Sequence, residues 1–394
     1  MTYHAGELAV QRRMGQSDSA IRVGQIISAD IPEVAAAFLA AQPLVFISAR
    51  DEDGRMWASQ IVGPPGFAHA ADARTIVIDA TPDHGDPLAG VLQSERKIGM
   101  LALQPQRRRR MRVNGTSVPS GDGLIVTTDQ VYSNCPKYIA RREISEIGPG
   151  PPSETRRGSA LDDAQQQAVS VTDTFIIGTA DGDGNADASH RGGNPGFLRL
   201  LSPKLLRWPD YLGNSMFMTL GNLHVDPRCG LLIPDWRTGS TLQLTGTARL
   251  NWDESTFAPG AQCSVDFTID EVVETINGSP LRWGHAEPSP ANPPLETRKT
   301  HDTPAIAAIR HRNRPPEGTG RRECVEHPRP RGRRRRLYRG FCVAKPRRVH
   351  YRACRNRRLL DPKVGQRERI CVAQGTLGIP GEPDGGALPV RVAR

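Results

Sequence analysis

The chain has 394 residues, with 52 Lys or Arg against 42 Asp or Glu, which gives a formal net charge of +10. Residues 298–394 hold 26 of the basic residues and 8 of the acidic ones, which leaves residues 1–297 with 26 basic against 34 acidic residues. The high isoelectric point therefore belongs to the tail, and nucleic acid is disfavoured as a partner of the body. The sequence has no run of 18 apolar residues and no apolar leader, so we expect no membrane partner and a cytoplasmic location with Cys135, Cys229 and Cys263 as free thiols.

The first part of the body predicts one helix followed by short strands. Residues 31–42 are Ala-rich, with apolar residues at helical spacing and a proline near the first turn, which predicts a helix. Residues 43–63 predict a hairpin, because Asp53-Gly54 between two apolar runs is a strong turn signal. The remaining predicted elements are a strand at 73–80, a short helix at 87–98 and strands at 99–105 and 111–118.

The second part of the body predicts the same order of elements. They are a helix at 162–174, a hairpin at 174–189, a strand at 204–210, a helix at 216–227 and strands at 229–236, 241–253 and 264–276. Few long helices and many short strands with turn signals favour a β-barrel in each half.

Part of the sequence is also written twice, at an offset of 130 residues. Gly54 falls on Gly184, and Pro65-Gly66-Phe67 falls on Pro195-Gly196-Phe197. Further on, KIGMLAL (97–103) resembles RCGLLIP (228–234), and MRVNGTSV (111–118) resembles LQLTGTAR (242–249). Two copies are too few for a solenoid, so we expect two related domains that pack as an internal pseudo-dimer.

The tail at 298–394 loses the apolar periodicity of the body and carries 23 Arg, 3 Lys and four of the seven Cys. One interpretation is a disordered basic arm for RNA or DNA. A second is a metal knuckle built from Cys324, His327, Cys342, His350 and Cys354, although no second half has a recognised spacing. A third is an out-of-frame translation of GC-rich DNA, which the abrupt change after SPANPPLETR (289–298) favours.

The order of elements in the body resembles that of the FMN-binding split barrel. The segments that carry the resemblance are GELAVQRRMG (6–15), SNCPKYI (133–139), ADASHRGGNPGF (186–197), LRWPDYLGNSMFMTLGNLHVDPRCGLL (206–232) and TLQLTGTARL (241–250). Over about residues 1–297 the chain resembles the pyridoxamine 5'-phosphate oxidase family, in its tandem flavin-nucleotide-binding branch. The resemblance implies a mainly β (α+β) fold of two tandem FMN-binding split β-barrels with short helices. The implied domains are a degenerate copy at 1–150, a copy with the FMN site at 151–297 and an irregular Arg-rich tail at 298–394.

The flavin chemistry is expected where the two copies differ. The second hairpin strand ends Ser59-Gln-Ile-Val-Gly63 in the first copy and Ser189-His190-Arg191-Gly192-Gly in the second. A flavin phosphate needs a charged fork and small neighbours through which backbone N–H groups can approach. Ser189, His190, Arg191 and Gly192 are therefore predicted to bind the cofactor, the alternative being that Arg191 only solvates a strand end.

A second difference follows at the third strand of each copy. The second copy has Trp208-Pro-Asp210-Tyr211-Leu-Gly-Asn214 where the first has the stretch that begins at Ile78. A flavin ring needs an apolar wall and a few polar partners. Trp208 and Tyr211 are predicted to form the wall, and Asp210, Asn214 and Asn222 to bind polar edges. Trp208 is equally explained as a core residue, and the first copy is expected to add a wall through Trp57 or the 63–67 loop.

Three other features carry weaker signals. Asp181–Asp187 alternates like a calcium loop, but Ala186 and Gly192 stand where that loop requires Gly and Glu, so no metal is expected. The four arginines at 107–110 predict a basic hairpin tip that is either solvated or reaches a ligand phosphate or a polyanion. Cys135 has no His or acidic partner at a recognised spacing, so it is not predicted to be a nucleophile.

These patterns predict an FMN-binding oxidoreductase that transfers hydride at flavin N5, with a small-molecule substrate or NAD(P)H as its partner. No obligatory acid or base is visible, so the catalytic residues and the substrate stay open. One alternative is a flavin or deazaflavin binding module without a substrate of its own. Another is a nucleic-acid-binding protein that acts through the tail. One flavin per chain and a monomeric pseudo-dimer are expected, with a homodimer as the alternative.

Overall fold

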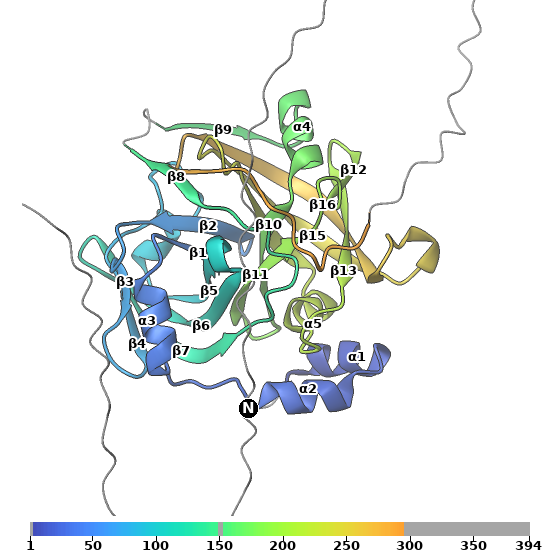
Figure 1. The fold of residues 1–394 in the computed structure, drawn as a ribbon, viewed down its shortest axis with the longest axis horizontal. Coiled ribbons are helices and arrows are strands. Elements are labelled where there is room, and N and C mark those ends of the chain that lie inside the picture. The colour runs from blue at the N-terminus through green and yellow to red at the C-terminus, as the bar shows by residue number, and fades with distance from the viewer. Residues whose placement is uncertain (1–2, 149–152, 295–394) are drawn as a thin grey trace, which may run out of the picture. The chain divides into compact units, whose positions relative to one another are not determined.

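The computed structural model describes residues 3–148 and 153–294, so the predictions for the tail at 298–394 lie outside the described residues. The described part is mainly β with short helices, and its two antiparallel sheets form two split-barrel-like domains (Figure 1). The fold class predicted for the body is confirmed.

The two sheets share one topology, because each strand of the first sheet has a counterpart in the second. The first sheet has the order β2-β1-β5-β6-β7-β4-β3, and the second has the order β11-β10-β14-β15-β16-β13-β12. The strands of the first are β1 (Leu44–Arg50), β2 (Met56–Val62), β3 (Ala68–Ala70), β4 (Thr75–Ile78), β5 (Arg96–Gln104), β6 (Arg109–Ser120) and β7 (Gly123–Ser133). Those of the second are β10 (Thr174–Ala180), β11 (Ala186–Gly192), β12 (Arg199–Ser202), β13 (Leu205–Tyr211), β14 (Arg228–Pro234), β15 (Thr241–Asn251) and β16 (Ala261–Ile276).

Smaller elements complete the described chain. β9 (Glu154–Gly158) pairs with β16, and β8 (Ile144–Ile147) pairs with β17 (Leu281–Trp283) in a separate two-stranded sheet. The helices are α1 (Ala5–Arg13), α2 (Ser17–Gly24), α3 (Glu33–Ala40), α4 (Asp163–Val171) and α5 (Met218–Val225), with 3₁₀ turns η1 (Val91–Gln93), η2 (Pro105–Arg107) and η3 (Glu254–Thr256). None of the helices in the described residues is long and apolar enough to cross a membrane.

The repeated sequence motif has a packing function in both copies. The predicted hairpins are confirmed as β1–β2 and β10–β11. After each hairpin, the glycine that precedes the Pro-Gly-Phe motif lies against the phenylalanine ring. A Cβ on Gly63 would lie 2.4 Å from Phe67 Cγ, and a Cβ on Gly193 would lie 2.6 Å from Phe197 Cγ. Both copies therefore have glycine at this position, because a larger residue would leave no room for the phenylalanine ring.

A second pair of glycines brings the two barrels together. A Cβ on Gly99 of β5 would lie 2.4 Å from the backbone nitrogen of Ala188 on β11. In the reciprocal contact, a Cβ on Gly230 of β14 would lie 2.5 Å from the carbonyl oxygen of Met56 on β2. The predicted similarity of 97–103 to 228–234 thus reflects a reciprocal contact of the kind that a two-fold pseudo-dimer makes.

The fold differs from the prediction in several elements. The expected helix at 87–98 is wrong beyond the three-residue turn η1, because β5 already begins at Arg96. Strand β7 and the helices α1 and α2 were not predicted as elements. Helix α1 packs on α5, and its Val10 belongs to the hydrophobic core of the second barrel (Figure 1). A helix that precedes the first barrel in the chain therefore completes the core of the second.

Candidate functional site

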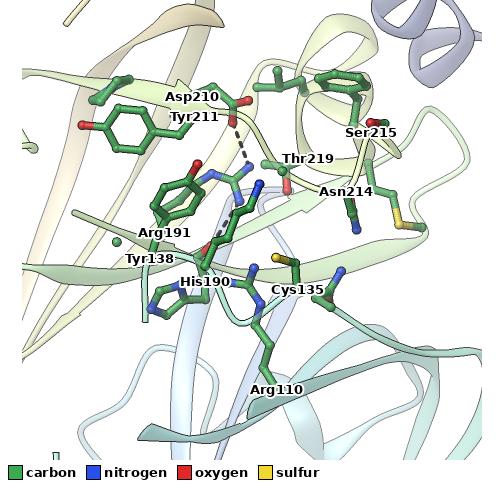
Figure 2. Close-up of a pocket in the computed structure, with 18 of the residues that line it drawn as sticks. Arg110, Cys135, Tyr138, His190, Arg191, Asp210, Tyr211, Asn214, Ser215 and Thr219 are labelled. Atoms are coloured by element: carbon green, nitrogen blue, oxygen red, sulfur yellow. Dashed lines mark hydrogen bonds and ion pairs between the residues drawn. The ribbon is translucent and has the colours of Figure 1, made fainter. Parts of the chain in front are cut away.

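A cavity lies where β11 of the second copy ends beside β6 of the first, and we call it the β11 cavity (Figure 2). The first copy supplies side chains from β6 and from the segment 134–138. The second copy supplies the end of β11, the end of β13 and the start of α5. The centre of a water molecule can reach a volume of about 90 Å³ in it. Both copies are therefore needed to build this site.

Three arginines converge on the β11 cavity. Arg110 and Arg112 lie two residues apart on β6, so their side chains leave the same face of the strand. Arg191 comes from the end of β11. Ser189 Oγ joins two of them, because it accepts hydrogen bonds from Arg112 Nη2 and, at 2.7 Å, from Arg191 Nη1. The site thus gathers cationic side chains that are about 80 residues apart in the sequence.

His190 is buried beside these arginines as a neutral ring. It is 3% exposed, and its Nδ1 accepts a hydrogen bond from Arg110 Nη1 at 3.0 Å. Burial, followed by the charges of Arg110 and Arg191, holds the pKa of His190 well below its usual range. Because Nδ1 accepts, the ring proton lies on Nε2.

The cluster has more cationic donors than acceptors. Asp187 Oδ2 lies 3.4 Å from Arg112 Nη1. Asp210 Oδ1 lies 3.5 Å from Arg191 Nη2 (Figure 2). Arg110 forms no ion pair with a described residue. Burial, together with the charges of Arg112 and Arg191, lowers the pKa of Arg110 to about 9, so this side chain remains cationic at pH 7.

Four nitrogen donors of the cluster are left without partners. Nε of Arg110, Arg112 and Arg191 and Nε2 of His190 are buried and make no hydrogen bond to a described residue. Buried polar groups, and above all buried charges, are normally paired, because an unpaired one loses its hydration without compensation. The arrangement therefore fits an anion with several acceptor oxygens.

The N-terminus of α5 adds a further positive end. Phe217 caps the helix in a left-handed conformation with φ 58°, and no side chain accepts from the first N–H groups. By contrast, α1 and α4 each begin with a capping box. Residues 217–220 line the β11 cavity. Free N–H groups and the helix dipole at such an end favour an anionic ligand.

Two tyrosines form an aromatic surface beside the cationic cluster. The rings of Tyr138 and Tyr211 have centroids 5.2 Å apart and are tilted by 36°. Tyr138 donates its hydroxyl hydrogen to the carbonyl oxygen of Leu212 at 2.9 Å, which fixes the segment 134–138 on the second copy. Burial, followed by the charge of Tyr138, raises the pKa of Tyr211 to about 12, so both rings stay neutral and can contact a flat apolar group.

Of the nine residues predicted from the sequence, six line the cavity: His190, Arg191, Gly192, Asp210, Tyr211 and Asn214. Ser189 lies behind the arginines that it joins. Trp208 is 1% exposed and packs against Phe175 in the core, so its position matches the core interpretation. Asn222 faces away from the cavity and binds His4 and Thr179, at 2.9 and 3.0 Å.

The contribution of the first copy differs from the expected one. Neither Trp57 nor the 63–67 loop lines the β11 cavity. The arginines at 107–110 are not simply a solvated tip, because Arg109 is exposed while Arg110 turns into the site. Arg112 was not considered from the sequence. The available signal was the spacing of Arg110 and Arg112, which places both on one face of a strand next to the repeat.

Comparisons with known proteins show a distant likeness of fold. No protein-family model and no curated protein matches the chain. The solved structure of HupZ from Group A Streptococcus aligns with 28% of this chain and 90% of its own, at 11% identity and a TM-score of 0.23. A candidate pyridoxamine 5'-phosphate oxidase from Lactobacillus delbrueckii aligns with 29% of this chain and 93% of its own, at 19% identity and a TM-score of 0.24. A conserved protein from Corynebacterium diphtheriae aligns with 32% of this chain and 98% of its own, at 12% identity and a TM-score of 0.24. Scores this low carry no argument about function, so the function is argued from the site itself.

Proposed function

We propose that the chain binds FMN in the β11 cavity and acts as a flavin-dependent oxidoreductase. The observation that carries the proposal is the set of four buried nitrogen donors without partners, on Arg110, Arg112, Arg191 and His190. A phosphate monoester carries a charge of about −1.5 to −2 at pH 7 and three acceptor oxygens. It would supply both the acceptors and the negative charge that this cluster lacks.

The size of the cavity decides which part of FMN it takes. Pockets that enclose a drug-sized ligand measure about 300–1,000 Å³, whereas water can reach about 90 Å³ here. The phosphate end fits this space, and the half-exposed pair Tyr138 and Tyr211 is the apolar surface available to the ring. Arg191 and Arg112 would hold the phosphate, with His190 as a neutral donor.

Bound flavin would supply hydride transfer at N5, and the chain would supply binding and orientation. Burial raises the pKa of Asp210, and the charge of Arg191 opposes this. We assign Asp210 the role of orienting Arg191 through their ion pair. A small-molecule substrate or NAD(P)H is the proposed partner, and a single flavin per chain in a monomer is the proposed assembly.

Titration of the purified full chain with FMN tests the proposal. We expect saturation at one FMN per chain, competition by inorganic phosphate, and a monomer by light scattering of the same sample. A fragment of residues 1–297 should bind FMN equally well, because every residue of the site precedes the tail. A folded chain with no affinity for FMN would contradict the proposal.

Reduction of the bound flavin separates an enzyme from a carrier. Rapid mixing of the FMN complex with NADH or NADPH, followed by an electron acceptor, should bleach and restore the flavin absorption. A complex that binds FMN tightly but is not reduced by either nucleotide would favour the binding module without a substrate of its own.

A further inference from the structure

The pseudo-symmetry of the fold places a counterpart of the β11 cavity at the end of β2, and we call it the β2 site. Strand β2 corresponds to β11 and β6 to β15, because the two sheets have the same strand order. The repeat aligns Ser59 with Ser189 at an offset of 130. It aligns Gln243 with Arg112 at the offset of 131 that relates 111–118 to 242–249.

The β2 site already contains an anion, the side chain of Asp86. Its Oδ1 accepts a hydrogen bond from Ser59 Oγ at 2.6 Å and from the backbone N–H of Leu88 at 2.8 Å. Its Oδ2 accepts from Gln243 Nε2 at 2.9 Å. Two of the three donors to this carboxylate, Ser59 and Gln243, are therefore the counterparts of Ser189 and Arg112.

The corresponding donors of the second copy have the same mutual arrangement, but among the described residues no carboxylate accepts a hydrogen bond from Ser189 Oγ. Gln243 Nε2 donates to Ser59 Oγ at 3.1 Å, and Arg112 Nη2 donates to Ser189 Oγ in the equivalent contact. The side chain that makes the same contact with the N–H two residues further on is the neutral amide of Asn214, whose Oδ1 accepts from the N–H of Met216 at 3.1 Å.

We propose that Asp86 is an internal substitute for a ligand anion that permanently fills the β2 site, and that a phosphate in the β11 cavity is held by the corresponding end of the second copy, bound by Arg112 and Arg191. The second half of this proposal rests on the proposed function, whereas the first half stands on the contacts of Asp86 alone. The filled site explains why one copy binds ligand and the other does not, and it makes Asp86 the residue that sets the stoichiometry.

At the β2 site, the positions that match Arg191 and Arg112 offer Asp86 no opposite charge. Ile61 stands where the β11 cavity has Arg191, and Gln243 stands where it has Arg112, so these positions supply no cation. Burial raises the pKa of Asp86 to about 6, the hydrogen bonds from Ser59, Leu88 and Gln243 oppose the rise, and the nearby charge of Asp83 adds to it. The carboxylate is thus held by hydrogen bonds without an opposite charge.

A count of bound inorganic phosphate tests the proposal on the full chain. The natural protein should bind one phosphate. The double variant Asp86→Ala/Gln243→Arg removes the internal carboxylate and restores the cation, so it should bind two. The matched single variant Gln243→Arg keeps the carboxylate and should still bind one.

The outcomes separate the two proposals. Two phosphates on the natural protein, or only one on a folded double variant whose β11 cavity still binds, would overturn the assignment of Asp86. No phosphate on the natural protein but one on the double variant would refute the proposed function and leave the role of Asp86 standing.

A second measurement applies if the double variant does not fold. The folded pKa of Asp86 near 6 lies above the unfolded value of about 3.9. Its protonation therefore stabilises the fold at low pH, and this stability is lost as the pH rises from about 4 to 6. Asp86→Asn should flatten that part of the stability profile, and superimposable profiles for the two proteins would overturn the proposal.

Discussion

The β11 cavity and the β2 site occupy equivalent places on equivalent strands, yet the first is open and cationic while the second is filled by the chain itself. In both, a residue of the neighbouring copy donates to a serine at the end of the hairpin strand, Arg112 to Ser189 and Gln243 to Ser59. The second contains the carboxylate of Asp86, whereas the first has four buried nitrogen atoms that make no hydrogen bond to a described residue.

The comparison shows how one scaffold supports an open cationic cavity and a closed counterpart. The backbone positions the donors in both places, so their geometry is a property of the fold. A few side chains decide whether each site is open or filled. The buried cations of the β11 cavity need an external anion, whereas the neutral donors Ser59 and Gln243 of the β2 site are satisfied by one carboxylate. Four predictions follow from this difference, in order of decreasing effect.

The largest effect is expected for Arg112→Gln, which gives the β11 cavity the residue of its counterpart. Asp187 would lose its buried cation, and breaking a buried pair in this way costs about 3–5 kcal/mol of unfolding free energy. Denaturant unfolding measures it. The equivalent change Gln243→Leu removes a neutral donor and should cost only about 1–3 kcal/mol. Equal losses would mean that the two sites do not differ in charge as described.

The next effect concerns the ligand. Arg191→Ala should weaken FMN binding tenfold to a hundredfold, since a charge-assisted contact contributes about 1.5–3 kcal/mol. Arg109→Ala is the matched control, because Arg109 is exposed and its guanidinium lies 5.0 Å over the ring of Phe38. Calorimetric titration of both variants decides, and equal weakening would argue against a specific phosphate contact.

The barrel interface should respond symmetrically. Gly99→Ala and Gly230→Ala each place a methyl group against the backbone of the other barrel, so each should lower the unfolding free energy by about 1–3 kcal/mol. Gly90→Ala is the control, because no atom lies within 4 Å of its added Cβ. A clear loss at one interface glycine and none at the other would break the pseudo-symmetry on which the comparison rests.

The smallest effect distinguishes the two serines. Ser59→Ala removes a hydrogen bond to Asp86 and should lower stability by about 0.5–1.5 kcal/mol without changing FMN affinity. Ser189→Ala should instead weaken FMN binding several-fold. Thermal unfolding and FMN titration of both variants give the four values needed, and a loss of FMN affinity in Ser59→Ala would show that the β2 site contributes to binding.

Local sequence signals determined much of the fold. Alternating apolar residues around Asp53-Gly54 specify the hairpin β1–β2, and the repeat at an offset of 130 specifies its counterpart β10–β11. The difference between Ser189-His190-Arg191 and the matching residues of the first copy also directed attention to the strand end that borders the β11 cavity. These signals succeed because turns and amphipathic strands depend on neighbours in the chain.

Other elements were decided by contacts between distant segments. Residues 87–98 have a helical pattern, yet β5 begins at Arg96 because its backbone pairs with β1 and β6. Strand β7 gave a weak signal, since its polar stretch at 127–130 interrupts the apolar alternation. Trp208 could equally have lined a ligand site, and only the packing of Phe175 against it places it in the core.

The site itself required the tertiary structure. Sequence alone located Arg191 and its neighbours, because the difference between two aligned copies is visible in one chain. It left open whether Arg110 is solvated or reaches a ligand, and it did not locate Arg112; their guanidinium groups reach His190 and Ser189 only after the two barrels pack. Nor did it show that Asp86 fills the second site, because its donors Ser59, Leu88 and Gln243 come from both copies. Composition and spacing record what each segment can form locally, whereas the meeting of charges across an interface depends on how the two barrels pack.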